Sequence, residues 1–211
     1  MMELFFSAFI TMFVVIDPPG CAPIYAGLTK EANAQQARAM AIRATLIAGA
    51  ILIGFALVGE DLLRALHIDL DSFRIAGGLM LFLIALDMVF EKRTQRREER
   101  AEKVLAENLN TSEVEDVSVF PMAMPMLAGP GAIASIMLLT SAANGPEQSL
   151  VVMAALLAVL VLTMFALIAA GPLMRLFGAR VEAVITRLLG VLLAALAAQY
   201  VIDGLRGSFG V

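Results

Sequence analysis

Few residues of this sequence can support metal, thiol or phosphate chemistry. Among 211 residues there is one cysteine and one histidine. Cys21 has no second cysteine with which to form an intramolecular disulfide, and a thiolate metal cluster is excluded. His67 and Cys21 alone argue against a catalytic zinc site or a cysteine–histidine nucleophile. We find no glycine-rich phosphate loop and no nucleophile elbow. The sequence predicts no enzyme and no cofactor.

Charge is also scarce. Charged residues make up 16% of the chain and hydrophobic residues 60%, whereas an average soluble domain is about 25% charged and about 45–50% apolar. A membrane-spanning helix needs roughly 20 apolar residues. This length therefore holds about six spans and leaves no room for a separate soluble domain.

The hydrophobic residues fall into six runs, 4–28, 42–59, 74–90, 117–141, 149–171 and 187–206. Polar stretches separate them at 29–41, 60–73, 91–116, 142–148 and 172–186. Runs of this length without strict alternation indicate helices, because lipid requires each backbone group to be satisfied internally. No basic segment precedes the first run, so we interpret it as an uncleaved first span.

Lysine and arginine set the expected orientation. Twelve of the 15 basic residues lie in the first, third and fifth connections or at the adjoining helix ends. Basic residues favour the cytoplasmic side. We therefore expect both termini to face outward from a bacterial or archaeal inner membrane, and the charged stretch 91–116 to be a cytoplasmic linker.

Two short segments match each other. Aligning Pro19-Gly20 with Pro130-Gly131 also aligns Leu28-Thr29 with Leu139-Thr140 without a gap. A weaker match relates Arg74-x-x-Gly77 to Arg187-x-x-Gly190. The sequence predicts an all-α membrane protein with two inverted three-helix repeats, 1–90 and 117–211, because an odd number of spans per half reverses the second half.

Both repeats carry a break near the middle of their first span. Proline removes a helical hydrogen bond and glycine tolerates unusual dihedral angles, so helices one and four should be discontinuous at 18–20 and 129–131. Each break opens a half-helix N-terminus, which favours an anion such as a carboxylate. The candidate substrate-binding residues are Asp17, Pro18, Pro19, Gly20, Cys21, Thr29, Gly129, Pro130, Gly131, Ala132 and Thr140.

The polar residues inside spans have two interpretations each. Asp17 is a functional carboxylate, for substrate or ion coupling, or the cap of the half-helix that begins at Pro18. Asp87 is interfacial or a proton- or cation-linked carboxylate. Thr29 and Thr140 are ligands or, more commonly, hydroxyls bonded to their own helix.

Three motifs resemble the MarC family, which is grouped with the LysE-type exporters. They are Ile16-Asp17-Pro18-Pro19-Gly20-x-Ala22-Pro23-Ile24, the run from Gly77 to Met88, and the run from Pro121 to Ile133. The resemblance covers essentially the whole chain. It implies a six-span inner-membrane protein, and in one branch the carriage of small neutral amino acids such as glycine and alanine, driven by an ion gradient. Cys21 stands where that pattern would have a small or polar residue such as Asn or Ser.

The leading hypothesis is thus a secondary transporter in which two halves move around a midplane site. The expected partners are a neutral amino acid, a coupling proton or sodium ion and the lipid bilayer, without nucleic acid; the oligomeric state stays open. One alternative is an intramembrane hydrolase that pairs Asp17 with Asp87, although their expected depths differ by roughly half the bilayer. Another is a membrane scaffold whose linker docks a partner.

Overall fold

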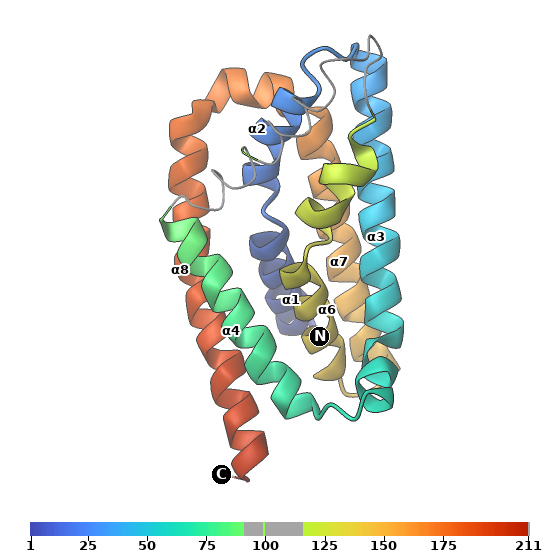
Figure 1. The fold of residues 1–211 in the computed structure, drawn as a ribbon, viewed down its shortest axis with the longest axis vertical. Helices are drawn as coiled ribbons and strands as arrows, with labels where there is room; N and C mark the ends of the chain where they lie inside the picture. The colour runs from blue at the N-terminus through green and yellow to red at the C-terminus, as the bar shows by residue number, and fades with distance from the viewer. Residues whose placement is uncertain (91–98, 100–115, 211) are drawn as a thin grey trace.

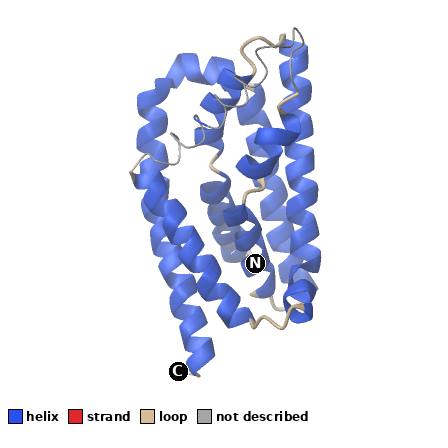
Figure 2. Ribbon diagram, in the orientation of Figure 1, coloured by secondary structure: helices blue, strands red, loops and turns tan. Residues whose placement is uncertain are grey.

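The computed structural model describes residues 1–90, 99 and 116–210, with the backbone alone for 174–182. Within these ranges the chain consists of helices and short connections, with no strand (Figures 1 and 2). Five helical stretches are long and apolar enough to cross a membrane, and a bent pair makes a sixth when it is counted as one span. The all-helical class is confirmed, and each of the six hydrophobic runs corresponds to one of these stretches.

The first half contains four helices. Helices α1 (Met2–Ile16) and α2 (Pro18–Leu28) share the first span, followed by α3 (Ala34–Ala65) and α4 (Leu70–Val89). Helix α3 begins at a capping box, in which Asn33 and Gln36 each accept the other's backbone N–H. The first span is therefore broken, as the sequence predicts, but the interruption is the single residue Asp17, and residues 18–20 form the first turn of α2.

The second half has a more distorted first span. Helix η1 (Ser118–Leu127) is irregular, and it meets α6 (Pro130–Ser141) at a bend of 53°. Phe120 and Met124 have extended dihedral angles inside η1, because each precedes a proline whose ring disfavours the helical conformation of the residue before it. Helices α7 (Pro146–Ile168) and α8 (Ala170–Phe209) complete the chain.

Two expected connections are helical instead. The polar stretch 172–186 belongs to α8, whose apolar spanning part is 183–209. The stretch 60–73 is mostly helix as well, since α3 continues to Ala65 and α4 starts at Leu70. Charged residues ended the hydrophobic runs, but they are good helix formers and the helices continue past the apolar part. The linker 91–116 lies almost wholly outside the described residues.

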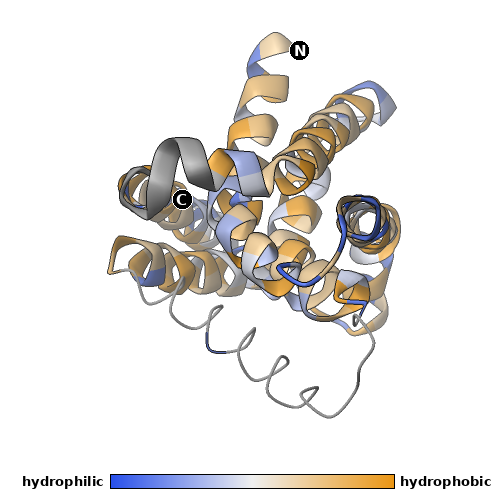
Figure 3. Cartoon of the chain, turned by 90° about the horizontal axis from the view of Figure 1, so that it is seen from above, coloured by the Kyte–Doolittle hydropathy of each residue, from blue (hydrophilic) through white to orange (hydrophobic). Residues whose placement is uncertain are grey.

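The helices of the first half pack mainly on those of the second. Helix α1 packs on α7 and α6, α2 on α8 and α7, and α3 on η1, α7 and α6. The most extensive contact joins α4 to α8, which run side by side along one flank (Figure 1). The helices are largely apolar along their lengths (Figure 3), and large apolar side chains of the spans face outward, as lipid contact requires; Leu57, Leu83 and Leu150 are 69%, 63% and 69% exposed.

Candidate substrate site at the helix breaks

Asp17 is the residue on which the first span breaks. Its backbone is left-handed (φ 58°, ψ 64°), and it ends α1 and begins α2. Its carboxylate accepts the N–H of Gly20 at 3.1 Å, and only 1% of the residue is exposed. Pro18 follows as the first residue of α2, where a missing N–H costs nothing. The structure therefore shows the capping role for Asp17.

Gly20 is held against that carboxylate. A Cβ added at Gly20 would lie 2.3 Å from Oδ2 of Asp17 and 2.8 Å from its Cγ. These separations are far below van der Waals contact. Any side chain at position 20 would therefore displace the carboxylate from its capping position.

The second break lacks such an acid. Gly129 is the N-cap of α6, and no side chain of the described residues caps this helix. Pro130 supplies the first residue, so the next free amides belong to Gly131 and Ala132, which are buried. The first turn of a helix leaves N–H groups without intrahelical acceptors. Unlike the start of α2, this N-terminus therefore has no carboxylate at its amides among the described residues.

The two breaks meet inside the bundle. A Cβ added at Gly131 would lie 3.6 Å from Cγ1 of Val15, 3.6 Å from Cδ2 of Leu81 and 2.5 Å from Cδ1 of Ile84. Val15 stands two residues before Asp17. The N-terminus of α6 thus lies between α1 and α4, within a turn of the first break.

Asp87 lies nearer this junction than the sequence indicated. It is half-buried and follows Ile84 by three residues on α4, which is about one helical turn, or about 4.5 Å along the axis. Helices α1 and α4 run in the same direction in Figure 1, and Val15 and Ile84 both contact the region of Gly131. The expected difference of half a bilayer between Asp17 and Asp87 is therefore wrong, because Asp17 lies 15 residues past the start of α1 at Met2 and Asp87 lies 17 residues past the start of α4 at Leu70.

The two threonines behave alike. Thr29 donates to the carbonyl of Tyr25 at 2.8 Å, and Thr140 donates to that of Ile136 at 2.9 Å. Both hydroxyls are thus bonded to the preceding turn of their own helix, the commoner of the two interpretations. Cys21 is fully buried, and its thiol donates to the carbonyl of Ile16 at 3.4 Å.

Ser135 is a candidate that the sequence analysis did not identify. It is fully buried in α6, and its hydroxyl has no hydrogen-bond partner within the described part of the chain. It follows Gly131 by four residues and therefore lies on the same face. A buried serine usually bonds to the carbonyl four residues earlier; the sequence contains no signal that this one does not.

An ion pair joins α3 to the end of the linker, just before η1. The guanidinium of Arg43 on α3 contacts the carboxylate of Asp116, which also accepts the N–H of Ser118. Partial burial acts to raise the pKa of Asp116, but the hydrogen bonds from Ser118 and the charge of Arg43 outweigh it and lower the pKa below its ordinary value. Within the described residues, no group of three histidine, cysteine, aspartate or glutamate side chains is placed to hold a metal ion.

Apolar spanning helices, two of them broken near proline–glycine pairs, define a multi-pass α-helical membrane protein. The chain matches the MarC family, described as integral membrane proteins, over residues 2–209. It belongs to that family, as the motifs indicated.

The curated relatives are membrane proteins of archaea and bacteria. The UPF0056 membrane protein of Archaeoglobus fulgidus is 33% identical over 97% of this chain and 93% of its own. UPF0056 membrane protein YhcE of Escherichia coli is 30% identical over 98% and 94%, and YvbG of Bacillus subtilis 31% over 100% and 98%. Their names describe membrane proteins and mention no enzymatic activity. No solved structure matches the chain.

Proposed function

We propose that this protein is a secondary transporter for a small neutral amino acid of the glycine or alanine type. The observation that carries the proposal is the meeting of the two breaks. The N-terminus of α6, which has no side-chain cap among the described residues, lies against α1 two residues before the buried carboxylate of Asp17. A zwitterion needs this pairing of a positive helix end with a carboxylate.

Each end of the substrate has a partner of the right chemistry. The substrate carboxylate binds the amides of Gly131 and Ala132, and the Ser135 hydroxyl on the same face adds a third donor. The ammonium group interacts with Asp17. Val15, Leu81 and Ile84 closely surround Gly131, so only a small substrate side chain fits.

The packing supports an inverted repeat of 1–90 and 117–211. The contact of α1 with α7 has a counterpart in that of η1 with α3, and the contact of α2 with α8 has one in that of α6 with α4. Exchanging the two halves replaces α1 by η1, α2 by α6, α3 by α7 and α4 by α8. This exchange turns each of these contacts into its counterpart. Such repeats are typical of transporters that alternate access around a midplane site.

The packing also favours one moving unit. The helices of each half pack mainly on the other half, which argues against two halves that rock as rigid bodies. Helices α4 and α8 make the most extensive contact of any helix pair in the described residues, so they form the more rigid unit. Helix α4 places Ile84 and Asp87 beside the break. We propose that this pair moves against α1, α3, α6 and α7, that a proton or sodium ion is coupled through Asp17 or Asp87, and that both termini face outward.

Uptake of labelled glycine and alanine into proteoliposomes tests the substrate. Ser135→Ala removes one hydrogen bond of about 0.5–1.5 kcal/mol, so we expect KM to rise roughly two- to twelvefold. The matched control is Thr163→Val, because the buried Thr163 hydroxyl is already bonded to the Val159 carbonyl at 2.7 Å. Absence of uptake by the native protein, or equal effects of both variants, would contradict the proposal.

A second measurement tests ion coupling. If Asp87 carries the coupling ion, Asp87→Asn should abolish accumulation under a proton or sodium gradient while leaving exchange of labelled for unlabelled substrate intact. Accumulation at the native level by Asp87→Asn would assign the coupling to Asp17 or to another group.

A further inference from the structure

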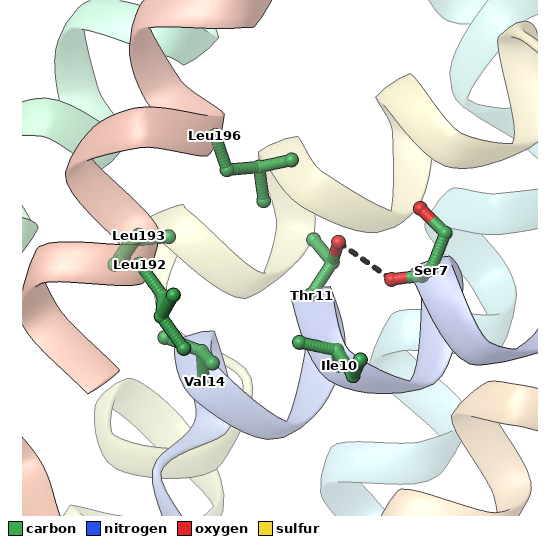
Figure 4. A pocket seen from close by; sticks show the side chains of 7 residues that line it. All are labelled: Ser7, Ile10, Thr11, Val14, Leu192, Leu193 and Leu196. Carbon is green, nitrogen blue, oxygen red and sulfur yellow. Dashed lines mark hydrogen bonds between the residues drawn. The ribbon is translucent and has the colours of Figure 1, made fainter. Parts of the chain in front are cut away.

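An apolar cavity lies between α1 and α8, on the N-terminal side of the first break. Its volume is about 310 Å³, which is at the low end of small-molecule sites. The lining residues, which Figure 4 shows pointing toward one another from the two helices, are Ser7, Ile10, Thr11, Val14, Leu192, Leu193 and Leu196.

The cavity offers an occupant no free hydroxyl from Thr11. Thr11, 2% exposed, donates to the Ser7 carbonyl of its own helix at 2.8 Å. Val14 and Leu193 form the deep walls and are 2% and 1% exposed. The exposed Ser7 carries the other hydroxyl of the lining, and one hydroxyl cannot replace the hydration of both charged ends of a zwitterionic amino acid. This cavity is therefore not the site proposed above.

The rim of the cavity faces the bilayer. Ile10 is 51% exposed and Leu192 is 57% exposed, and both lie within candidate spans. Ser7 and Val14 are seven residues apart, which is about 10 Å along the axis of α1, and Val14 lies three residues before the break at Asp17. The cavity therefore extends through much of one leaflet, whose hydrocarbon depth is about 15 Å.

We infer that the cavity binds one acyl chain of a membrane lipid from the leaflet at the N-terminal side. Hydrocarbon is the solvent that reaches the rim, and the walls match it in polarity and in length along the bilayer normal. A bound chain lies between α1, which contains the break, and α8, which packs on α4. The inference rests on membrane insertion and not on transport.

The absence of tryptophan makes a direct test possible. Leu192→Trp places a single fluorophore at the rim, and Leu157→Trp, at a site 48% exposed on α7, is the lipid-facing control. Phosphatidylcholine with brominated acyl chains, a short-range quencher, is added at low mole fraction to the purified protein in detergent. We expect quenching of Leu192→Trp to saturate at about one lipid per protein, while that of Leu157→Trp rises in proportion to the brominated lipid.

Two cavity-filling substitutions, called fillers below, then test whether the lipid occupies the space between the two walls. Leu196→Phe on α8 and Val14→Phe on α1, each combined with Leu192→Trp, should remove the saturable quenching. Two fillers are used so that a poorly folded variant leaves the other to decide. Equal and proportional quenching at both tryptophans, or saturable quenching that survives a well-folded filler, overturns the inference.

Discussion

At the first break, Asp17 and Gly20 determine each other. The carboxylate caps α2 only because position 20 has no side chain, and the left-handed backbone of Asp17 directs it toward that amide. Aspartate tolerates this conformation better than most residues with a side chain. The break at Asp17 thus positions a buried carboxyl group as well as interrupting the helix.

Gly20→Ala should destabilise the protein by about 0.5–2 kcal/mol, the usual cost of a lost N-cap, because its Cβ would lie 2.3 Å from Oδ2 of Asp17. The fully buried Cys21 is the only cysteine, so a thiol-reactive dye followed during heating reports unfolding of α2. Gly27→Ala in the same helix is the control, since nothing lies within 4 Å of its Cβ. Equal melting temperatures for the two variants would refute the capping argument.

The roles of single residues could be predicted from the sequence where their hydrogen-bond partners are close in the chain. The cap at Asp17 and the bonded hydroxyls of Thr29 and Thr140 depend on neighbours within four residues, which the sequence displays. Ser135 and the depth of Asp87 depend on how α6 and α4 approach other helices. Serine at position 135 looks like any other serine in an apolar run, so only the packed structure identifies its hydroxyl.

Among the elements, the α4–α8 pair has the closest packing. A Cβ added at Gly78 would lie 2.8 Å from the Ala197 carbonyl oxygen, and one at Gly204 would lie 2.7 Å from that of Asp71. A Cβ added at Gly190 would lie 2.9 Å from Cβ of Met88. Small residues of this kind let membrane helices approach each other when no hydrophobic effect drives them together. The pair therefore holds together through backbone contact along most of α4.

Gly78→Ala should therefore separate α4 from α8 and lower stability by roughly 1–3 kcal/mol, the cost of overpacking against rigid atoms. Gly54→Ala on α3 is the matched control, because its Cβ meets nothing within 4 Å. Thermal unfolding in detergent measures both. If the α4–α8 pair is the moving unit, Gly78→Ala should also reduce uptake more than its loss of folded protein explains; full native stability would contradict the close packing.

The elements themselves were largely predictable, but their ends were not. Six hydrophobic runs located the spans, and prolines located the breaks at Asp17 and Gly129. The helical stretch 172–186 was missed because hydropathy reports contact with lipid and not backbone conformation. The distortions at Phe120 and Met124 have a local cause, the prolines at 121 and 125, and the sequence contains it.

Across the whole molecule, the repeat in sequence does not correspond to a pair of separate packing units. The principal neighbours of α1, α2, α3 and α4 all lie in the second half. In an interleaved arrangement, the helices of each half pack on those of the other half and not on one another. Hydropathy and loop charge cannot distinguish two adjacent bundles from two interleaved ones, since both have the same spans and orientation. The interleaving brings the two breaks to one junction, because α6 inserts between α1 and α4.

Interleaving predicts how a divided chain behaves. Residues 1–103 and 104–211, produced as separate polypeptides, should each be recovered as aggregated or degraded material, because neither retains the partners of its own helices. Produced together with different tags, they should copurify as a monodisperse complex, because the cut falls in the charged stretch 91–116 and severs no described helix. Size-exclusion chromatography after sequential affinity steps distinguishes these outcomes. A monodisperse, thermally cooperative fragment 1–103 on its own would mean that the first half has a core of its own, and the motion of the α4–α8 pair would then lose its basis.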